Sequence, residues 1–473
     1  MTQTTLVGPD LFAWYAANPL LGFFPRKLDF LECGDYLRHD PSAAWGGQLP
    51  ADLREDMAND VKRAFAPTKI ALQAVMALQN MLYTGLRARD PRAPANRRWP
   101  YQTGELLGHK LDELPWFPTY AAGATLRGIT GCGKSLCIER FLLPRFEQVY
   151  VHEKRDDCAW SEMRQLSYLI VPMPADGSRG GLLLEIAMQM DARLGTEYAT
   201  QLRTRFKTVE KGLVAILHWL SLHRCGLLVV EEAQERHATV HVFGSEFVTF
   251  FLRVMNFGIP LALVGNPLAF KHIDAYSQDV RRFSEGGRFI FDPVSDHRSV
   301  AWTRDLIPAV WGFNVFDESD EFIEDLPLRL WNMTGGIPDA LCRLRRVSLT
   351  EAISLGGQRV EAKHVQLAYM SPVYAPMRQL VEVFVKKDAS LLSKFKDIPI
   401  DYFREKWEAE CREEAKRVAL KKLKAGETSQ PEAKPSDADG PDDRRGPVFL
   451  QGMQAKQAAL DAKANGLQPN PGV

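Results

Sequence analysis

The sequence has no net charge and no paired cysteine motif. Lys plus Arg and Asp plus Glu each number 59 in the 473-residue chain. A balanced chain exerts no long-range attraction on a polyanion, so any DNA binding must come from a local basic face. The seven cysteines are scattered and never form a CxxC pair, which favours reduced thiols in a cytosolic compartment.

Membrane-spanning and secretory signals are missing as well. No apolar run approaches the ~18 to 20 residues that a membrane span needs. The start, Met1-Thr2-Gln3-Thr4, lacks the basic-then-apolar pattern of a signal peptide. We therefore expect a cytoplasmic protein without membrane contact. Its content of 45% hydrophobic and 25% charged residues is ordinary for a folded chain and predicts a sizeable core.

Composition and periodicity divide the chain into an N-terminal helical extension (1–120), a core (121–300), a small helical lid (301–372), a further helical segment (373–424) and a disordered tail (425–473). In the core, short apolar runs alternate with longer helical patterns, which indicates an α/β fold with a parallel sheet. The expected strands are Ala124–Arg127, Tyr168–Val171, Leu227–Val230, Leu261–Val264 and Arg288–Phe291.

A phosphate-binding loop follows the first of these strands. Its sequence, which matches GxxxxGK[ST], is Gly128-Ile129-Thr130-Gly131-Cys132-Gly133-Lys134-Ser135. The motif stands between an apolar strand and a helix, as its mechanism requires. The glycines let backbone N–H groups curl around a β-phosphate, Lys134 reaches the β- and γ-phosphates, and the Ser135 hydroxyl is a ligand for Mg²⁺. The sequence therefore predicts a site for ATP and Mg²⁺.

A second strand supplies acidic residues. The run Leu227-Leu228-Val229-Val230 ends in Glu231-Glu232. We expect Glu231 to hold the Mg²⁺ shell and Glu232 to polarise the attacking water as a general base. The alternative is an acidic pair on the surface without a catalytic role. The four aliphatic residues before it indicate a buried strand and disfavour this alternative.

Polar residues also stand at the ends of two later elements, a strand and a helix. Asn266 follows the run Leu261–Val264 and is a candidate γ-phosphate sensor, although a residue chosen for the turn before Pro267 explains it equally well. Arg281 and Arg282 stand at a helix end before the last strand. There they are candidate arginine fingers for a neighbouring subunit, and the alternative is a solvated basic helix end.

With these elements in order, the chain resembles the AAA+ superfamily and, within it, the TnsC/TniB regulators of transposition. The likeness covers roughly residues 80 to 370. Besides the phosphate-binding loop, the segments that carry the narrower resemblance are Leu82-Tyr83-Thr84-Gly85-Leu86-Arg87-Ala88-Arg89-Asp90-Pro91, Pro174-Ala175-Asp176-Gly177-Ser178, Gly195-Thr196-Glu197-Tyr198, Glu231-Glu232-Ala233-Gln234 and Val264-Gly265-Asn266-Pro267.

The resemblance implies an ATP-dependent homo-oligomeric ring or filament on double-stranded DNA that links a target-selection protein to a transposase. The sequence departs from the family pattern at two positions. Glu231 replaces the usual Asp of the metal-binding strand, and Asp339 stands where many relatives place an arginine sensor. We expect the first to affect metal placement and the second to remove nucleotide sensing from the lid.

Backbone-tracking on DNA needs cations aimed at phosphates, and no base readout is expected. The candidates, each of which is individually also explained as an ordinary solvated charge, are Lys154, Arg155, Arg179, Arg203, Arg205, Lys207 and Lys211. Further along, the mixed-sign run from Tyr402 to Lys424 is interpreted as a solvated helix. In the tail, the apolar island Gly446-Pro447-Val448-Phe449-Leu450 has the form of a peptide that docks on the transposase.

Three functions stay open at this point. The first is a DNA-bound, ATP-switched assembly factor for transposition. The second is a STAND-type signalling ATPase without a DNA role, and the third is a replication initiator or clamp-loader-like AAA+ protein. Binding to duplex DNA that depends on an ATP analogue separates the second from the others.

Overall fold

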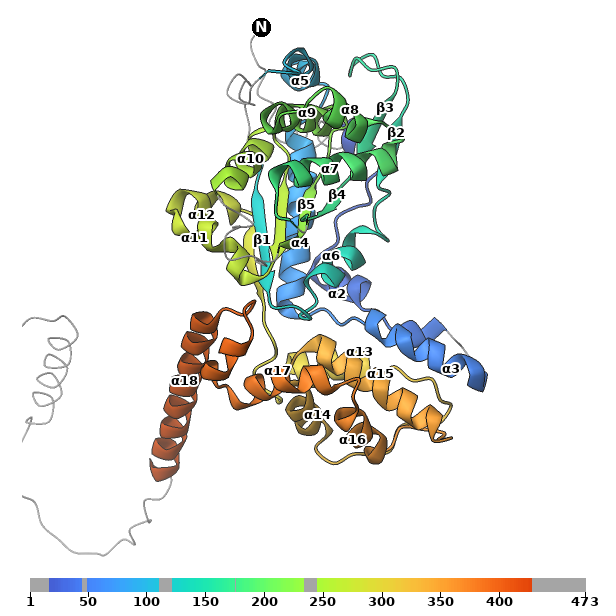
Figure 1. The fold of residues 1–473 in the computed structure, drawn as a ribbon, viewed down its shortest axis with the longest axis vertical. Coiled ribbons are helices and arrows are strands. Elements are labelled where there is room, and N and C mark those ends of the chain that lie inside the picture. The colour runs from blue at the N-terminus through green and yellow to red at the C-terminus, as the bar shows by residue number, and fades with distance from the viewer. Residues whose placement is uncertain (1–16, 45–48, 110–120, 175, 234–244, 428–473) are drawn as a thin grey trace, which may run out of the picture. The chain divides into compact units, whose positions relative to one another are not determined.

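The computed structural model describes residues 17–44, 49–109, 121–174, 176–233 and 245–427. The chain forms two compact units, which meet in sequence at Glu408 and Ala409. The first unit contains the sheet and nearly all of the helices (Figure 1). Of the second, the structure describes the later turns of helix α18 (Ile400–Glu427), where Arg417 pairs with Glu414.

A parallel five-stranded sheet in the order β4-β5-β6-β1-β7 forms the centre of the first unit. Strand β1 lies between β6 and β7, so that Thr125 is in register with Leu263 on one side and Arg288 on the other. All five predicted strands are confirmed. Their bounds are β1 Gly123–Gly128, β4 Leu169–Pro172, β5 Leu228–Ala233, β6 Leu261–Gly265 and β7 Gly287–Phe291.

Alternate residues of each strand face opposite sides of the sheet, and helices cover both sides. Ala124, Leu126 and Val264 belong to one buried cluster, which includes helices α4 (Lys69–Ala88) and α6 (Lys134–Leu142). Leu261 and Leu263 belong to the other cluster, which includes helices α7 (Arg179–Leu194) and α9 (Val209–Leu222). Because both faces are apolar and covered, the strands read in the sequence as continuous hydrophobic runs.

The region before the core is helical, and its longest helix is α4. In α4, Ala71, Val75, Leu78 and Leu82 are buried, and the Thr68 hydroxyl caps the helix by accepting from the Ala71 N–H. The helix packs on β1 and β7, so it belongs to the layer that covers one face of the sheet. The elements before the core are η1 Pro19–Leu21, α2 Phe30–Leu37, η2 Pro41–Ala44, α3 Ala51–Ala58, η3 Asn59–Arg63, α4 Lys69–Ala88 and α5 Pro94–Glu105.

Within the core, the connections between strands are mostly helical, as βα units require. A short antiparallel pair, β2 with β3, is an addition that the sequence did not predict. The bounds are α6 Lys134–Leu142, β2 Val149–His152, β3 Met163–Leu166, α7 Arg179–Leu194, α8 Tyr198–Thr204, α9 Val209–Leu222, α10 Ser245–Asn256, η5 Pro267–Phe270, α11 Lys271–Ala275 and α12 Ser277–Phe283.

A helical region follows β7, as expected for the lid. Gly335 and Gly336 have φ of +60° and +71°, a left-handed conformation that a side chain disfavours, and they separate α14 from α15. The Gly336 carbonyl accepts from the Val294 N–H at 2.9 Å. The helices are η6 Ala301–Leu306, which has π geometry, α13 Ile307–Trp311, α14 Leu326–Thr334, α15 Pro338–Ser354 and α16 Ala362–Met370.

The C-terminal segment contains α17 (Ala375–Lys386), η7 (Ala389–Lys394) and α18. The interpretation of a fully solvated helix from Tyr402 is wrong for its first turns, because Phe403 and Trp407 are buried against Phe384 of α17. Helix α18 also passes the predicted start of the tail and ends at Glu427. The rest of the predicted tail, including the apolar island, lies outside the described residues.

No helix among the described residues has both the length and the apolar character needed to cross a bilayer. In the same part of the chain, no group of three or more His, Cys, Asp or Glu side chains forms a preassembled metal site.

Candidate nucleotide-binding site

The phosphate-binding loop connects the end of β1 to the start of α6, as the sequence predicts. Gly131 and Gly133 have φ of +86° and +85°, which lets the backbone turn sharply and leaves Gly133 as the N-cap of α6. Gly128 is needed for a different reason, since a Cβ there would lie 2.2 Å from the Phe291 carbonyl oxygen. The loop therefore offers backbone N–H groups and a helix N-terminus to an anion.

Lys134 lies inside this loop. Its ammonium donates to the carbonyls of Gly128 at 2.8 Å and Ile129 at 2.9 Å. Burial lowers its pKa, and the charge of the nearby Glu231 carboxylate acts in the opposite direction. Burial likewise raises the pKa of the Cys132 thiol to about 12, which keeps this loop cysteine neutral.

The loop and Asn266 line one cavity of about 210 Å³. Gly265 and Asn266 follow β6, the strand beside β1, so that both elements meet at the carboxyl edge of the sheet. Ligands of open α/β sheets bind at this edge. The structure thus brings together residues that the sequence separates by about 130 positions. The lining residues are Gly128, Thr130, Gly131, Gly133, Lys134, Ser135, Leu136, Val264, Gly265 and Asn266.

Both acidic candidates belong to β5. Glu231 is buried at 7% exposure, and it is close enough to Lys134 to influence its titration. The Glu231 carboxylate and the Ser135 hydroxyl are hard oxygen donors of the kind that Mg²⁺ prefers. For Glu232 the structure describes the backbone position in β5 and not the side chain. Its role as a base stays a prediction.

Asn266 caps the turn that follows β6 and also lines the cavity. Its Oδ1 accepts from the Leu268 N–H at 3.0 Å, which caps η5. A backbone N–H can only donate, so the opposite side of the carboxamide is the Nδ2 group. Nδ2 donates to the Asp397 carbonyl from the segment before α18. The same Asn266 side chain can therefore cap the turn with its oxygen and act as a phosphate sensor with its NH₂ group.

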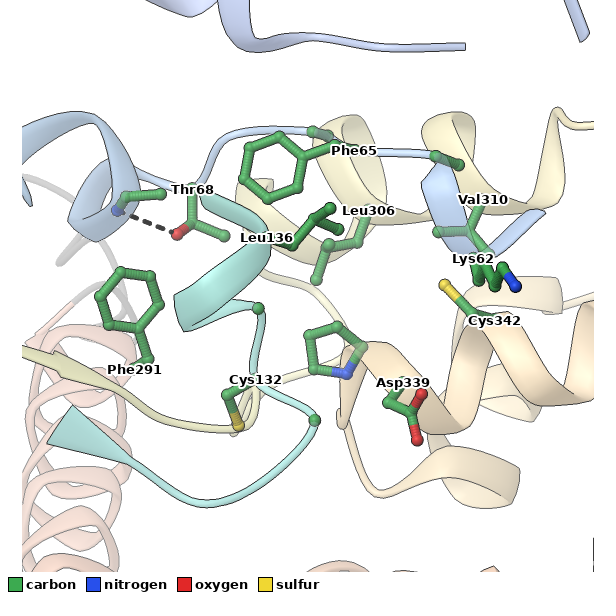
Figure 2. Close-up of a pocket in the computed structure, with 16 residues that line it drawn as sticks. Lys62, Phe65, Thr68, Cys132, Leu136, Phe291, Leu306, Val310, Asp339 and Cys342 are labelled. Atoms are coloured by element: carbon green, nitrogen blue, oxygen red, sulfur yellow. Dashed lines mark hydrogen bonds between the residues drawn. The ribbon is translucent and has the colours of Figure 1, made fainter. Parts of the chain in front are cut away.

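A second cavity, of about 200 Å³, adjoins the other side of the loop. Figure 2 shows Phe65, Leu136, Leu306 and Val310 among the residues that line it, together with Cys132 and Asp339. Its walls come from the segment between η3 and α4, the loop, η6, α13 and α15. These residues could not be predicted from the sequence, because no local motif signals contacts between segments this far apart.

The lid contacts the loop through Asp339. Its backbone N–H donates to the Gly131 carbonyl at 3.0 Å, and its carboxylate accepts from Arg343 Nε at 2.9 Å. The expected arginine at position 339 is absent, as the sequence indicates, but a guanidinium stands one helical turn further on. No sequence motif pointed to Arg343 in advance.

Arg281 and Arg282 lie at the other end of the sheet. The Arg282 carbonyl would be 3.1 Å from a Cβ on Gly123, which begins β1, whereas the phosphate-binding loop follows its end. A strand of this length spans about 20 Å. Neither side chain reaches its own subunit's phosphate site, so an action on a nucleotide requires a second copy. Arg282 Nη2 donates a hydrogen bond to Asn256 Oδ1, and Arg281 is exposed.

Comparison with protein families agrees with this geometry. Residues 120–273 match the family model described as AAA domain. The core has the AAA+ fold. A parallel-sheet core of this fold with a helical C-terminal region is thus confirmed, whereas the narrower resemblance to the transposition regulators stays a prediction. Comparison with curated proteins finds no significant sequence relative.

Solved structures of low similarity include two Orc structures and one of Cdc6p. The Aeropyrum pernix Orc1 protein in complex with DNA is 17% identical over 60% of this chain and 68% of its own, with a TM-score of 0.34. Cdc6p from Pyrobaculum aerophilum is 13% identical over 58% and 66%, with a TM-score of 0.36. Drosophila ORC bound to DNA is 12% identical over 87% and 90%, with a TM-score of 0.34. Likenesses of this strength assign no function.

Proposed function

We propose that the chain is a Mg²⁺-dependent ATPase. The loop amides and the start of α6 hold the β-phosphate, and Lys134 turns from the Gly128 and Ile129 carbonyls to the β- and γ-phosphates. Ser135 and Glu231 would hold Mg²⁺, which would offset the charge of the phosphates. Glu232 takes a proton from the attacking water, and Asn266 donates to the γ-phosphate. The observation that carries this proposal is the single cavity shared by Lys134, Ser135 and Asn266.

The second cavity suits the purine base. It adjoins the phosphate-binding loop at Gly131, Cys132 and Gly133, and its walls are mostly apolar, with Phe65 and Leu136 among them. Flat aromatic ligands bind in such pockets through contact area, with a few polar groups that fix their orientation. Lys62 and Asp339 are the charged residues in the described lining. The phosphates then extend from this cavity across the loop to Lys134 and Asn266.

We infer that the ATP-bound form assembles on double-stranded DNA through its phosphates. Four exposed cations at the turn between α8 and α9 supply the local basic face that a neutral chain needs. No described residue forms an ion pair with these four, which are Arg203, Arg205, Lys207 and Lys211. Lys154 and Arg155 are weaker candidates, because they pair with Asp156 at 3.3 Å and Asp157 at 2.7 Å.

Replacing these four cations by alanine is expected to weaken binding to random-sequence duplex DNA. The slope of log affinity against log salt should fall by about 3 to 4, since each phosphate contact contributes about 0.9. Fluorescence anisotropy at several salt concentrations measures both quantities. The matched control replaces the same number of cations that already pair with acids, namely Lys363, Lys386, Arg404 and Arg417. Equal losses in the two variants would show that the effect is one of net charge.

The biological setting that we propose is DNA transposition. The support is the sequence resemblance to the TnsC/TniB regulators, whose partners are a transposase and a target-selection protein. In two of the segments that carry this resemblance, side-chain hydrogen bonds stabilise the start of a helix. The Asp191 carboxylate accepts from Thr196 and from the N–H groups of Tyr198 and Ala199, and Ser178 caps α7. The reading as a replication initiator stays compatible with the AAA+ fold.

An integrase-type transposase encoded beside this gene, and captured by the ATP-bound chain on DNA, supports transposition. Capture of a replicative helicase in its place supports the initiator function. Electron microscopy with an ATP analogue and random duplex DNA tests the assembly that both share. Absence of rings or filaments on DNA would favour the signalling class.

We further propose that Arg281 acts on the nucleotide of a neighbouring subunit. Arg281→Ala should leave ATP binding unchanged and lower hydrolysis in the assembled state by about 10³-fold, the effect of losing an arginine finger. Gln278→Ala, on the same helix, is the control. Mixing the Arg281→Ala chain with a Lys134→Ala chain should restore activity, since each supplies what the other lacks. Normal hydrolysis by assembled Arg281→Ala protein contradicts the role.

A further inference from the structure

A segment far from the phosphate-binding loop in sequence contacts the candidate sensor. The Asp397 carbonyl accepts from Asn266 Nδ2, while Asn266 Oδ1 is fixed by the Leu268 N–H. An amide NH₂ group carries two hydrogens. One is used by Asp397, and the second belongs to a side chain that lines the cavity with Lys134 and Ser135. The orientation of the sensor thus depends on where residue 397 is held.

The first turns of α18 fix the position of Asp397. Tyr402 Oη donates to Asp292 at 2.5 Å, and Lys406 Nζ donates to the same carboxylate at 2.6 Å. These side chains are four residues apart and so lie on one helix face. Asp292 follows Phe291, which is in register with Gly128 at the start of the loop. Both side chains of the ion pair are largely buried, at 25% exposure for Lys406 and 15% for Asp292.

The neighbouring face of the same turns is anchored to α17. Phe403 and Trp407, again four residues apart, pack edge-on against Phe384 with ring centroids 5.1 and 5.7 Å away. Ile398 is buried as well. It borders a cavity that also contains Leu268 and Ile290. The segment 397–407 is therefore fixed by contacts on both faces rather than resting loosely on the sheet.

We propose that Asp292, Tyr402 and Lys406 are positioning residues for Asn266. By fixing the Asp397 carbonyl, they hold the Asn266 carboxamide with its second N–H toward the γ-phosphate. This inference rests on the proposed ATP site and adds an element to it. A preorganised donor gains affinity because it needs no ordering when the ligand binds. Because ADP lacks the γ-phosphate that Asn266 contacts in the proposed site, the segment selects ATP over ADP.

The test compares ATPγS and ADP affinities by calorimetry, using the full chain with Mg²⁺. The variant Asp292→Asn/Tyr402→Phe/Lys406→Met removes the three polar contacts and keeps the net charge. Its preference for ATPγS over ADP should fall about tenfold, the contribution of one hydrogen bond to a charged group, with ADP affinity unchanged. The matched control Asp401→Asn/Arg404→Met removes an exposed ion pair from the same helix and should behave as wild type.

A double-mutant cycle separates positioning from a general structural effect. Asn266→Ala should lose the same preference, and adding the triple variant to it should cause no further loss. Tyr402→Phe alone, which deletes a single oxygen, should give a smaller loss in the same direction, while Lys406→Arg should retain the preference. Equal weakening of ATPγS and ADP, or losses that add in the combined variant, would overturn the inference.

The outcomes also separate this inference from the function beneath it. Wild-type protein that binds neither nucleotide refutes the ATP site and the inference together. Wild-type protein that binds both nucleotides equally refutes the sensor and its positioning and leaves the nucleotide site in place.

Discussion

Lys134→Ala is expected to abolish ATP binding. Lys134 is the one cation among the described residues that line the phosphate cavity, and a triphosphate would have no substitute for it there. Loss of hydrogen bonds to two phosphate groups predicts a fall in affinity of about 100-fold or more. Calorimetry or a fluorescent ATP analogue measures the change.

The control for this variant is Lys271→Ala, which removes an exposed lysine from α11, close in sequence to Asn266. Its ATP affinity should match that of the wild type. Lys134→Arg should also fail, because a planar guanidinium does not replace the compact ammonium inside a closed loop. Retention of affinity within threefold by Lys134→Ala would mean that the phosphates bind elsewhere.

Glu232→Gln is expected to stop hydrolysis without preventing ATP binding. Gln keeps the size of the side chain but cannot accept a proton, and the loss of a general base lowers rates by about 10²- to 10⁴-fold. The ATP-bound assembly on DNA should therefore accumulate. Phosphate release and electron microscopy, performed on the same sample, measure both effects.

Glu231→Gln separates the two carboxylates of β5. Because Glu231 is buried near Lys134, its replacement should raise the Mg²⁺ concentration needed for ATP binding. Glu232→Gln should leave that concentration unchanged. A Glu232→Gln protein that hydrolyses ATP at the wild-type rate would show that the base is another residue.

The sequence predicted those elements that are marked by a short, continuous run of residues. The five strands were found because buried parallel strands give short continuous apolar runs. The phosphate-binding loop was found because its glycines, lysine and hydroxyl must be contiguous to surround one phosphate. Asn266 was found through its position after a strand, and the shared edge of a parallel sheet then brought it to the loop.

The rest depended on contacts between distant segments. Phe65 and Leu306 line one cavity, but they belong to the segment before α4 and to η6, and neither stands in a motif. Tyr402 and Lys406 looked like members of a solvated charged helix, because a mixed-sign pattern does not reveal a buried carboxylate more than 100 residues earlier. The spacing of Phe403 and Trp407 was the available signal that one face of this helix is covered.

Titration of the purified 473-residue chain with ATP, once with Mg²⁺ and once with a chelator, decides whether the chain contains a metal-dependent ATP site. We expect saturable binding to one site per chain that weakens when the metal ion is removed. Absence of ATP binding in the presence of Mg²⁺ would contradict it.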